Sequence, residues 1–187
     1  MLTEDYLIRR INQAIALLMH ALGLRKDGQL VAAQTDIDIA LELILGMRSV
    51  LLKEMDDASL LQLLTVRGEI DTERLALVAK LFKEEAAIFD LEGRPSDSIR
   101  DGLRALNFLL ILAMDEKAGL TADQITDIEQ LRAWLQGQRL PLDTQAALLD
   151  YYQRLLEFDD ARLAEVNVNR AEIEKVLQEL IDTLSQY

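Results

Sequence analysis

The chain has 187 residues, half of them hydrophobic and 28% of them charged, a balance that is typical of a folded protein and argues against a disordered one. Its net charge of −13, with no sizeable cluster of basic residues, makes binding to nucleic acid or to anionic lipid unfavourable. The sequence has no cysteine, which excludes disulfides, thiolate nucleophiles, zinc knuckles and iron–sulfur clusters.

The amino-terminal segment shows neither the pattern of a secretory signal nor that of a membrane span. Glu4 and Asp5 precede the first apolar stretch, at the place where a secretory signal has basic residues. The most apolar stretches, 11–24 and 103–114, contain polar residues and are too short to cross a bilayer. We therefore expect a cytoplasmic protein that does not bind membranes.

The first two helices are predicted to form an antiparallel hairpin over about 3–45. Thr3 is a suitable cap for the first helix, in which apolar residues recur every three or four positions, as on a buried face. Basic residues followed by Gly28 end this helix, and a second helix is predicted over about 29–45. Because the connection is short, the two helices should be antiparallel neighbours.

Residues 47–70 are predicted to be an insertion of short helices. The apolar clusters 50–55 and 59–66 are each long enough for one or two helical turns. Asp56 and Asp57 separate the two clusters and can cap the second one.

A second long hairpin is predicted over about 71–116. Asp71 opens its first helix, which ends near Gly93. Pro95 suits the first turn of the next helix, because its missing amide hydrogen costs nothing at that position. That helix is predicted to continue to about Glu116.

Further helices are predicted over about 121–186. Thr121 and Gln124 have the spacing of a capping box, which opens a helix over about 121–138. After a stop at Pro141, one helix is predicted over about 143–165.

The last predicted helix carries an apolar stripe that must pack against something, either within the chain or in a homodimer. Asn169 can cap this helix. The stripe consists of Ile173, Val176, Leu177, Leu180, Ile181 and Leu184.

With few glycines and prolines and no alternating apolar runs, the sequence predicts one all-helical domain over 1–187.

A spaced pattern of glycine and small residues occurs twice in the chain. Small residues let two antiparallel helices approach closely, so the pattern predicts a helical hairpin that is built twice. The first copy comprises Gly28, Leu30, Ala33, Ala40 and Leu41, and the second comprises Gly93, Ile99, Ala105 and Leu106.

This pattern resembles the tetratricopeptide repeat, whose second helix follows a glycine and carries small residues at similar spacings. The resemblance implies hairpins stacked as a short, irregular solenoid, interrupted by 47–70. The segments Asp5-Tyr6-Leu7, 22–26 and 83–86 also look like a family of uncharacterised cytoplasmic proteins from Gram-positive bacteria. That second resemblance implies the same fold and supplies no activity.

The resemblance to tetratricopeptide repeats implies a groove, lined by the first helix of each hairpin, that binds a protein or peptide. Either such a partner or the carboxyl-terminal helices of the chain could fill this groove. Transferred by position, the groove residues are Leu18, Leu22 and Lys26 from the first hairpin, with Ile15 and Met19, and Lys80, Lys83 and Glu84 from the second, with Ala87 and Leu91.

The sequence offers little chemistry for catalysis. His20 is the single histidine, which is too few for a di-iron bundle, and no nucleophile elbow or phosphate-binding glycine loop is present. Adjacent carboxylates, such as Glu84 and Glu85, diverge by about 100° around a helix and are predicted to be solvated. We expect a non-enzymatic interaction module without cofactor or metal.

A helical domain that binds a small molecule, or an enzyme with a pocket between the hairpins, is the alternative. Tyr6, Arg9, His20 and Tyr151 are the polar side chains that could converge on such a pocket. An acidic surface that mimics nucleic acid is a third hypothesis.

Overall fold

The computed structural model describes residues 2–115 and 119–185. Within these residues it contains ten α-helices and one two-stranded ribbon, which confirms the all-α class. The helices group into two compact units, Met1–Ala105 and Leu106–Tyr187. That the whole chain is one domain stays a prediction.

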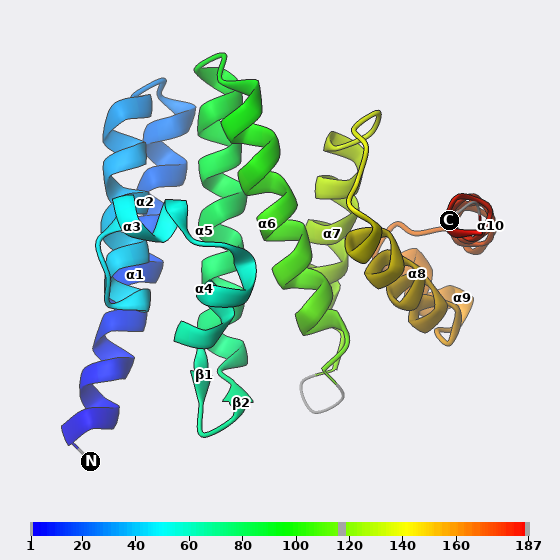
Figure 1. Cartoon of the computed structure of the whole chain (residues 1–187), viewed down its shortest axis with the longest axis horizontal. Coiled ribbons are helices and arrows are strands. Elements are labelled where there is room, and N and C mark those ends of the chain that lie inside the picture. The colour runs from blue at the N-terminus through cyan, green and yellow to red at the C-terminus, as the bar shows by residue number, and fades with distance from the viewer. Residues whose placement is uncertain (1, 116–118, 186–187) are drawn as a thin grey trace. The chain divides into compact units, whose positions relative to one another are not determined.

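The first unit begins with an antiparallel helix pair, α1 and α2, whose connection contains Gly28 in the left-handed region, at a φ of +74°. α2 packs against α1 and against α5 (Figure 1). Helix α1 begins at Leu2, so the predicted cap Thr3 lies inside the helix and not before it. The helices of this unit are α1 (Leu2–Lys26), α2 (Leu30–Leu45), α3 (Ser49–Glu54), α4 (Asp57–Leu63), α5 (Thr72–Leu91) and the first part of α6 (Pro95–Ala113).

Small side chains in the first unit lie where the two hairpin patterns predict them. Ala33 and Ala40 of α2 are completely buried, as are Ala14 and Ala21 on the facing helix α1. In the second copy of the pattern, Ala105 of α6 is also completely buried. Alanine at these positions lets the helices pack closely, because its side chain is a single methyl group.

The segment between the hairpins contains two short helices, α3 and α4, as predicted, and also a β-ribbon. Asp56 caps α4 by accepting a hydrogen bond from the Ser59 amide, at 2.7 Å. A short ribbon that the sequence analysis missed follows, formed by β1 (Thr65–Val66) and β2 (Glu69–Ile70). Its turn requires positive φ angles, which Arg67 (55°) and Gly68 (85°) adopt.

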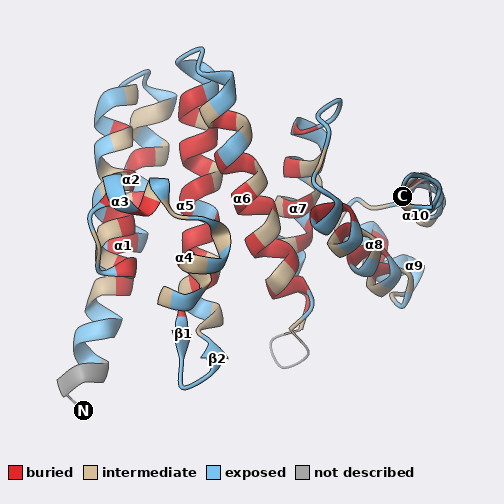
Figure 2. Ribbon diagram, viewed as in Figure 1, coloured by how far each residue is buried: buried red, intermediate tan, exposed pale blue. Residues whose placement is uncertain are grey.

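Helix α5 lies at the centre of the first unit. Figure 2 shows it buried along most of its length, and only a few of its positions, such as Lys80 and Leu91, are exposed. Arg74 donates a 2.6 Å hydrogen bond to the carbonyl oxygen of Ile44 and so joins the start of α5 to the end of α2. At the other end, the hydroxyl of Ser98 on α6 donates to the Ala86 carbonyl of α5, at 2.7 Å.

The second unit has its own core, built around two fully buried tyrosines of α8, Tyr151 and Tyr152. Helix α10 packs against α8. The capping box of Thr121 and Gln124 is present, and Asn169 caps α10 through the Ala171 amide. Besides the last part of α6, the unit contains α7 (Ala122–Trp134), α8 (Leu142–Leu156), α9 (Asp160–Glu165) and α10 (Arg170–Leu184).

Several predicted boundaries in this unit are wrong. The single helix expected over 143–165 is two helices, because Asp159 caps a new one by accepting from the Arg162 amide at 2.8 Å. The helix expected to reach residue 138 ends at Trp134, ahead of Gly137 with a φ of +86°. Helix α6 ends at Ala113, whereas the predicted end near Glu116, like the end of the predicted 121–186 segment, lies outside the described residues.

None of the described helices combines the length and the apolar composition that crossing a bilayer requires.

Candidate functional site

The predicted groove residues of α1 form a strip along one side of the helix. Ile15, Met19, Leu22 and Lys26 follow one another at spacings of three or four residues, which places them on one face. Ile15 (44%) and Met19 (63%) are exposed, Leu22 is half-buried and Lys26 is exposed. Leu18 is instead buried and belongs to the core.

The predicted groove residues of α5 divide between surface and interior. Lys80 is exposed and Lys83 is half-buried. Glu84 is buried, and its carboxylate accepts a charge-assisted hydrogen bond from the guanidinium of Arg25 on α1. This ion pair joins α1 to α5, so Glu84 positions the two helices and is not available to a ligand.

The single histidine has an ordinary surface environment. Nδ1 of His20 lies 2.6 Å from a carboxylate oxygen of Asp36, and the His20 side chain is two-thirds exposed. Tyr6 and Arg9 are also exposed on α1, whereas Tyr151 is buried in the other unit. The residues considered for a pocket are therefore divided between the two units.

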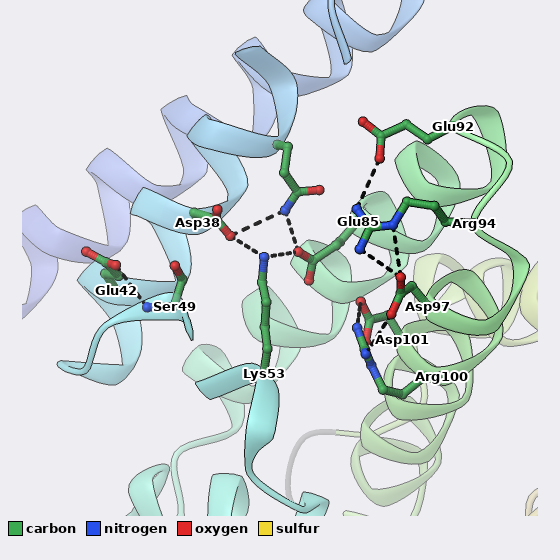
Figure 3. Close-up of polar contacts among 11 residues, drawn as sticks. Asp38, Glu42, Ser49, Lys53, Glu85, Glu92, Arg94, Asp97, Arg100 and Asp101 are labelled. Carbon is green, nitrogen blue, oxygen red and sulfur yellow. Dashed lines mark hydrogen bonds and ion pairs between the residues drawn. The ribbon is translucent and has the colours of Figure 1, made fainter. Parts of the chain in front are cut away.

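The most concentrated polar cluster of the first unit surrounds Glu85 of α5, which is completely buried. Nζ of Lys53, on the short helix α3, lies 2.6 Å from its carboxylate and 2.5 Å from that of Asp38 on α2 (Figure 3). The amide nitrogen of Gln34 donates a further hydrogen bond to Glu85, at 2.5 Å. Four side chains from α2, α3 and α5 thus form one network.

Burial changes the protonation equilibrium of this network. Removal from water, together with the nearby carboxylate of Asp101, raises the pKa of Glu85 to about 7, against the opposing effect of Lys53. Burial lowers the pKa of Lys53, but the carboxylates of Glu85 and Asp38 outweigh it, so the net pKa is raised. Lys53 therefore stays charged, and Glu85 titrates near neutral pH.

The prediction that Glu84 and Glu85 are solvated is wrong. The two side chains do diverge around the helix, as expected, but α5 is packed on several sides, so both directions lead into the interior. Each carboxylate therefore has a cationic partner, Arg25 in one case and Lys53 in the other. These pairings could not be assigned from the sequence, because Arg25 is 59 residues before Glu84 and Lys53 is 32 residues before Glu85.

A row of ion pairs follows the start of α6. Arg94 and Arg100 both contact the carboxylate of Asp97, with Arg94 Nη2 at 2.7 Å and Arg100 Nη1 at 2.8 Å (Figure 3). Arg100 also bonds to Asp101, which is completely buried, through Nε at 2.8 Å. No hydrogen bond among the described residues joins this row to the network of Glu85, but the carboxylate of Asp101 lies close enough to Glu85 to raise its pKa.

A second polar cluster, centred on Glu129 of α7, lies in the second unit. The hydroxyls of Tyr151 and Tyr152 donate to its carboxylate at 3.1 and 2.9 Å, and Nε of Arg132 approaches it to 3.3 Å. Burial, reinforced by the adjacent carboxylate, raises the pKa of both tyrosines well above the ordinary value. Both hydroxyls therefore remain protonated donors.

A cleft of about 410 Å³ opens beside this cluster, between α7, the start of α10 and the loop that precedes α10. This size falls in the range of small-molecule sites. Sequence reasoning missed the cleft, because its polar residues come from segments that no motif connects. The lining residues are Thr126, Glu129, Gln130, Arg132, Ala133, Tyr152, Val166, Asn167, Val168, Glu172, Ile173 and Val176.

Among residues 2–115 and 119–185, no three histidine or carboxylate side chains gather in a way that could hold a metal ion. No protein-family model, curated protein or solved structure matches this chain.

Proposed function

We propose that the chain is a non-catalytic interaction module whose first unit binds a protein or peptide in the cytoplasm. The observation that carries this proposal is the strip on α1, where Ile15 and Met19 expose apolar surface beside the exposed cation Lys26. Ile8, two turns before Ile15 on the same side of α1, is 51% exposed and extends the strip. Contiguous exposed apolar surface is typical of a binding face.

The proposal includes a tetratricopeptide-like arrangement of the first unit. In its support, α1 and α5, the first helices of the two hairpins, pack against each other and are joined by the Arg25–Glu84 ion pair. Lys80 and Lys83 would then extend the strip with positive charge. A partner with an apolar face and acidic residues would complement this surface, in which Leu18 supports the strip from beneath and Leu22 contributes to its edge.

A displayed library of random peptides tests the proposal. We expect peptides enriched on the full chain to bind the wild type and a Gln13→Asp variant equally, and to lose binding to Met19→Asp. Both substitutions add one negative charge to an exposed position of α1, but Gln13 lies on the other side of the helix from the strip. Enriched peptides that bind Met19→Asp as well as the wild type would contradict the assignment, and so would failure to enrich any peptide.

Small-molecule binding is a second candidate function, which one specific observation favours. The cleft of the second unit combines charged and neutral polar groups with an apolar wall, so it offers both kinds of contact to a small ligand. It lies within one unit and does not depend on Tyr6, Arg9 or His20, the residues that the sequence analysis considered.

A further inference from the structure

The cleft beside Glu129 has two charged side chains of opposite sign that are only loosely paired. Nη2 of Arg132 lies 3.8 Å from a carboxylate oxygen of Glu172, which is longer than a hydrogen bond. Glu172 is 65% exposed at its side chain, whereas Arg132 is 27% exposed. Such a pair is easily opened, because little hydrogen bonding is lost.

Contacts with Glu129 and Tyr152 hold the guanidinium of Arg132 in place. Its Nε approaches Glu129, and its guanidinium carbon lies 5.5 Å from the ring centre of Tyr152. Glu129 is itself held by the hydroxyls of Tyr151 and Tyr152, so its carboxylate is already satisfied. Within the part of the chain that the structure describes, the terminal nitrogens of Arg132 have no acceptor at hydrogen-bond distance. They are the donors that this cleft offers to a ligand.

Aliphatic side chains elsewhere in the lining favour a ligand with an apolar part. Ile173 and Val176 come from the first two turns of α10, and Val166 and Val168 come from the preceding loop. An aliphatic group of a few carbons is stabilised there, because its apolar surface is removed from water. The cleft therefore suits a ligand with charged groups at one end and a short hydrocarbon chain at the other.

We propose that this cleft binds a free aliphatic α-amino acid. Its carboxylate would accept hydrogen bonds from the terminal nitrogens of Arg132, its ammonium would pair with Glu172, and its side chain would contact Val166 and Val168. A zwitterion inserted across the loose pair gives each protein charge a closer partner. A ligand with one charge separates the pair and leaves Arg132 or Glu172 without compensation.

The charge of the whole chain supports a zwitterion over an anion. A net charge of −13 repels a free carboxylate at a distance but leaves a ligand without net charge unaffected. Asn167 and Thr126, which also line the cleft, add neutral polar groups and no further charge. This inference rests on the second candidate function and is independent of peptide binding by the first unit.

Titration calorimetry of the full chain with three related compounds tests the proposal. L-leucine carries both charges, 3-methylbutylamine lacks the carboxylate, and 4-methylpentanoate lacks the ammonium. We expect leucine to bind at least about tenfold more tightly than either analogue, a difference of about 1.4 kcal/mol. Equal binding of the amine would indicate a simple cation site, and equal binding of the acid a simple anion site. Either result, or no leucine binding up to about 10 mM, would overturn the proposal.

Two substitutions assign the binding to the cleft. Glu172→Gln should weaken leucine binding about tenfold and bring it close to that of 4-methylpentanoate, because the partner of the ammonium is lost. Glu174→Gln, a change of the same kind at an exposed residue of α10 outside the lining, should leave leucine binding unchanged. Leucine affinity that is the same in both variants would place the site elsewhere. Loss of peptide binding by Met19→Asp would still be expected, so the two proposals fail independently.

Discussion

Lys53 and Glu85 form an ion pair of 2.6 Å between a six-residue helix and the most buried helix of the first unit. Glu85 is completely buried, whereas the Lys53 side chain remains 20% exposed. Lys53 also contacts Asp38 of α2, so one ammonium joins α2, α3 and α5. The 47–70 segment is thereby fastened by a charge as well as by apolar residues, such as the fully buried Leu52.

Glu85 should make the stability of the protein depend on pH between about 4.5 and 7. Its pKa is raised to about 7 from the ordinary 4.5, chiefly by burial, so folding favours the protonated form. The stabilisation is therefore complete below pH 4.5 and is lost as the pH rises through 7. Two buried oxygens of this network, Glu85 Oε2 and Gln34 Oε1, have no hydrogen-bond partner among the described residues, and protonation of Glu85 would add a donor to the network.

Urea unfolding of wild type and Glu85→Gln at pH 5 and pH 8 measures this effect. The amide cannot ionise, so we expect the variant to gain stability relative to the wild type by on the order of 2 kcal/mol as the pH rises from 5 to 8. Glu54→Gln removes a carboxylate from an exposed position of α3 and should follow the wild type. A difference between wild type and Glu85→Gln that is the same at both pH values would contradict the assignment.

Replacing Lys53 by methionine should destabilise the fold at pH 8 by about 3 kcal/mol, because a buried carboxylate then loses its cation. The loss should be smaller at pH 5, where Glu85 is protonated. Lys80→Met, at an exposed position of α5, serves as the control and should change the free energy of unfolding by less than about 0.5 kcal/mol. A Lys53→Met variant as stable as the control at pH 8 would show that the ion pair contributes nothing.

The sequence predicts the helices of this protein better than its polar contacts. The starts and ends of helices depend on neighbouring backbone groups, so they could be inferred from local sequence. Examples are Gly28, Pro95 and the cap at Thr121. The missed break at Asp159 has equally local chemistry, but an aspartate within an acidic helical pattern is not distinctive. The pairing of Glu85 with Lys53 depends on which face of α5 is covered, and that is a tertiary property.

Self-association through α10 follows from the apolar stripe that the sequence predicts. Ile173, Val176 and Leu177 are buried within the second unit, but Ile181 remains 43% exposed. If a second copy covers this end of the stripe, sedimentation should show a dimer whose fraction rises with concentration, and Ile181→Asp should remain monomeric. Glu179→Asp, on the same helix, keeps the charge and should dimerise as the wild type does. A wild-type monomer at every concentration would refute the homodimer.

The hydroxyl of Tyr152 should contribute measurably to the stability of the second unit. It donates to Glu129 at 2.9 Å from a side chain that is almost fully buried, so Tyr152→Phe leaves a carboxylate with one donor fewer. We expect a loss of about 1–2 kcal/mol in the free energy of unfolding. Tyr6→Phe removes the same hydroxyl from an exposed ring on α1 and should have little effect. Equal stability of the two variants would mean that Tyr151 and Arg132 alone satisfy Glu129, and the cleft beside it would then be held without the Tyr152 hydroxyl.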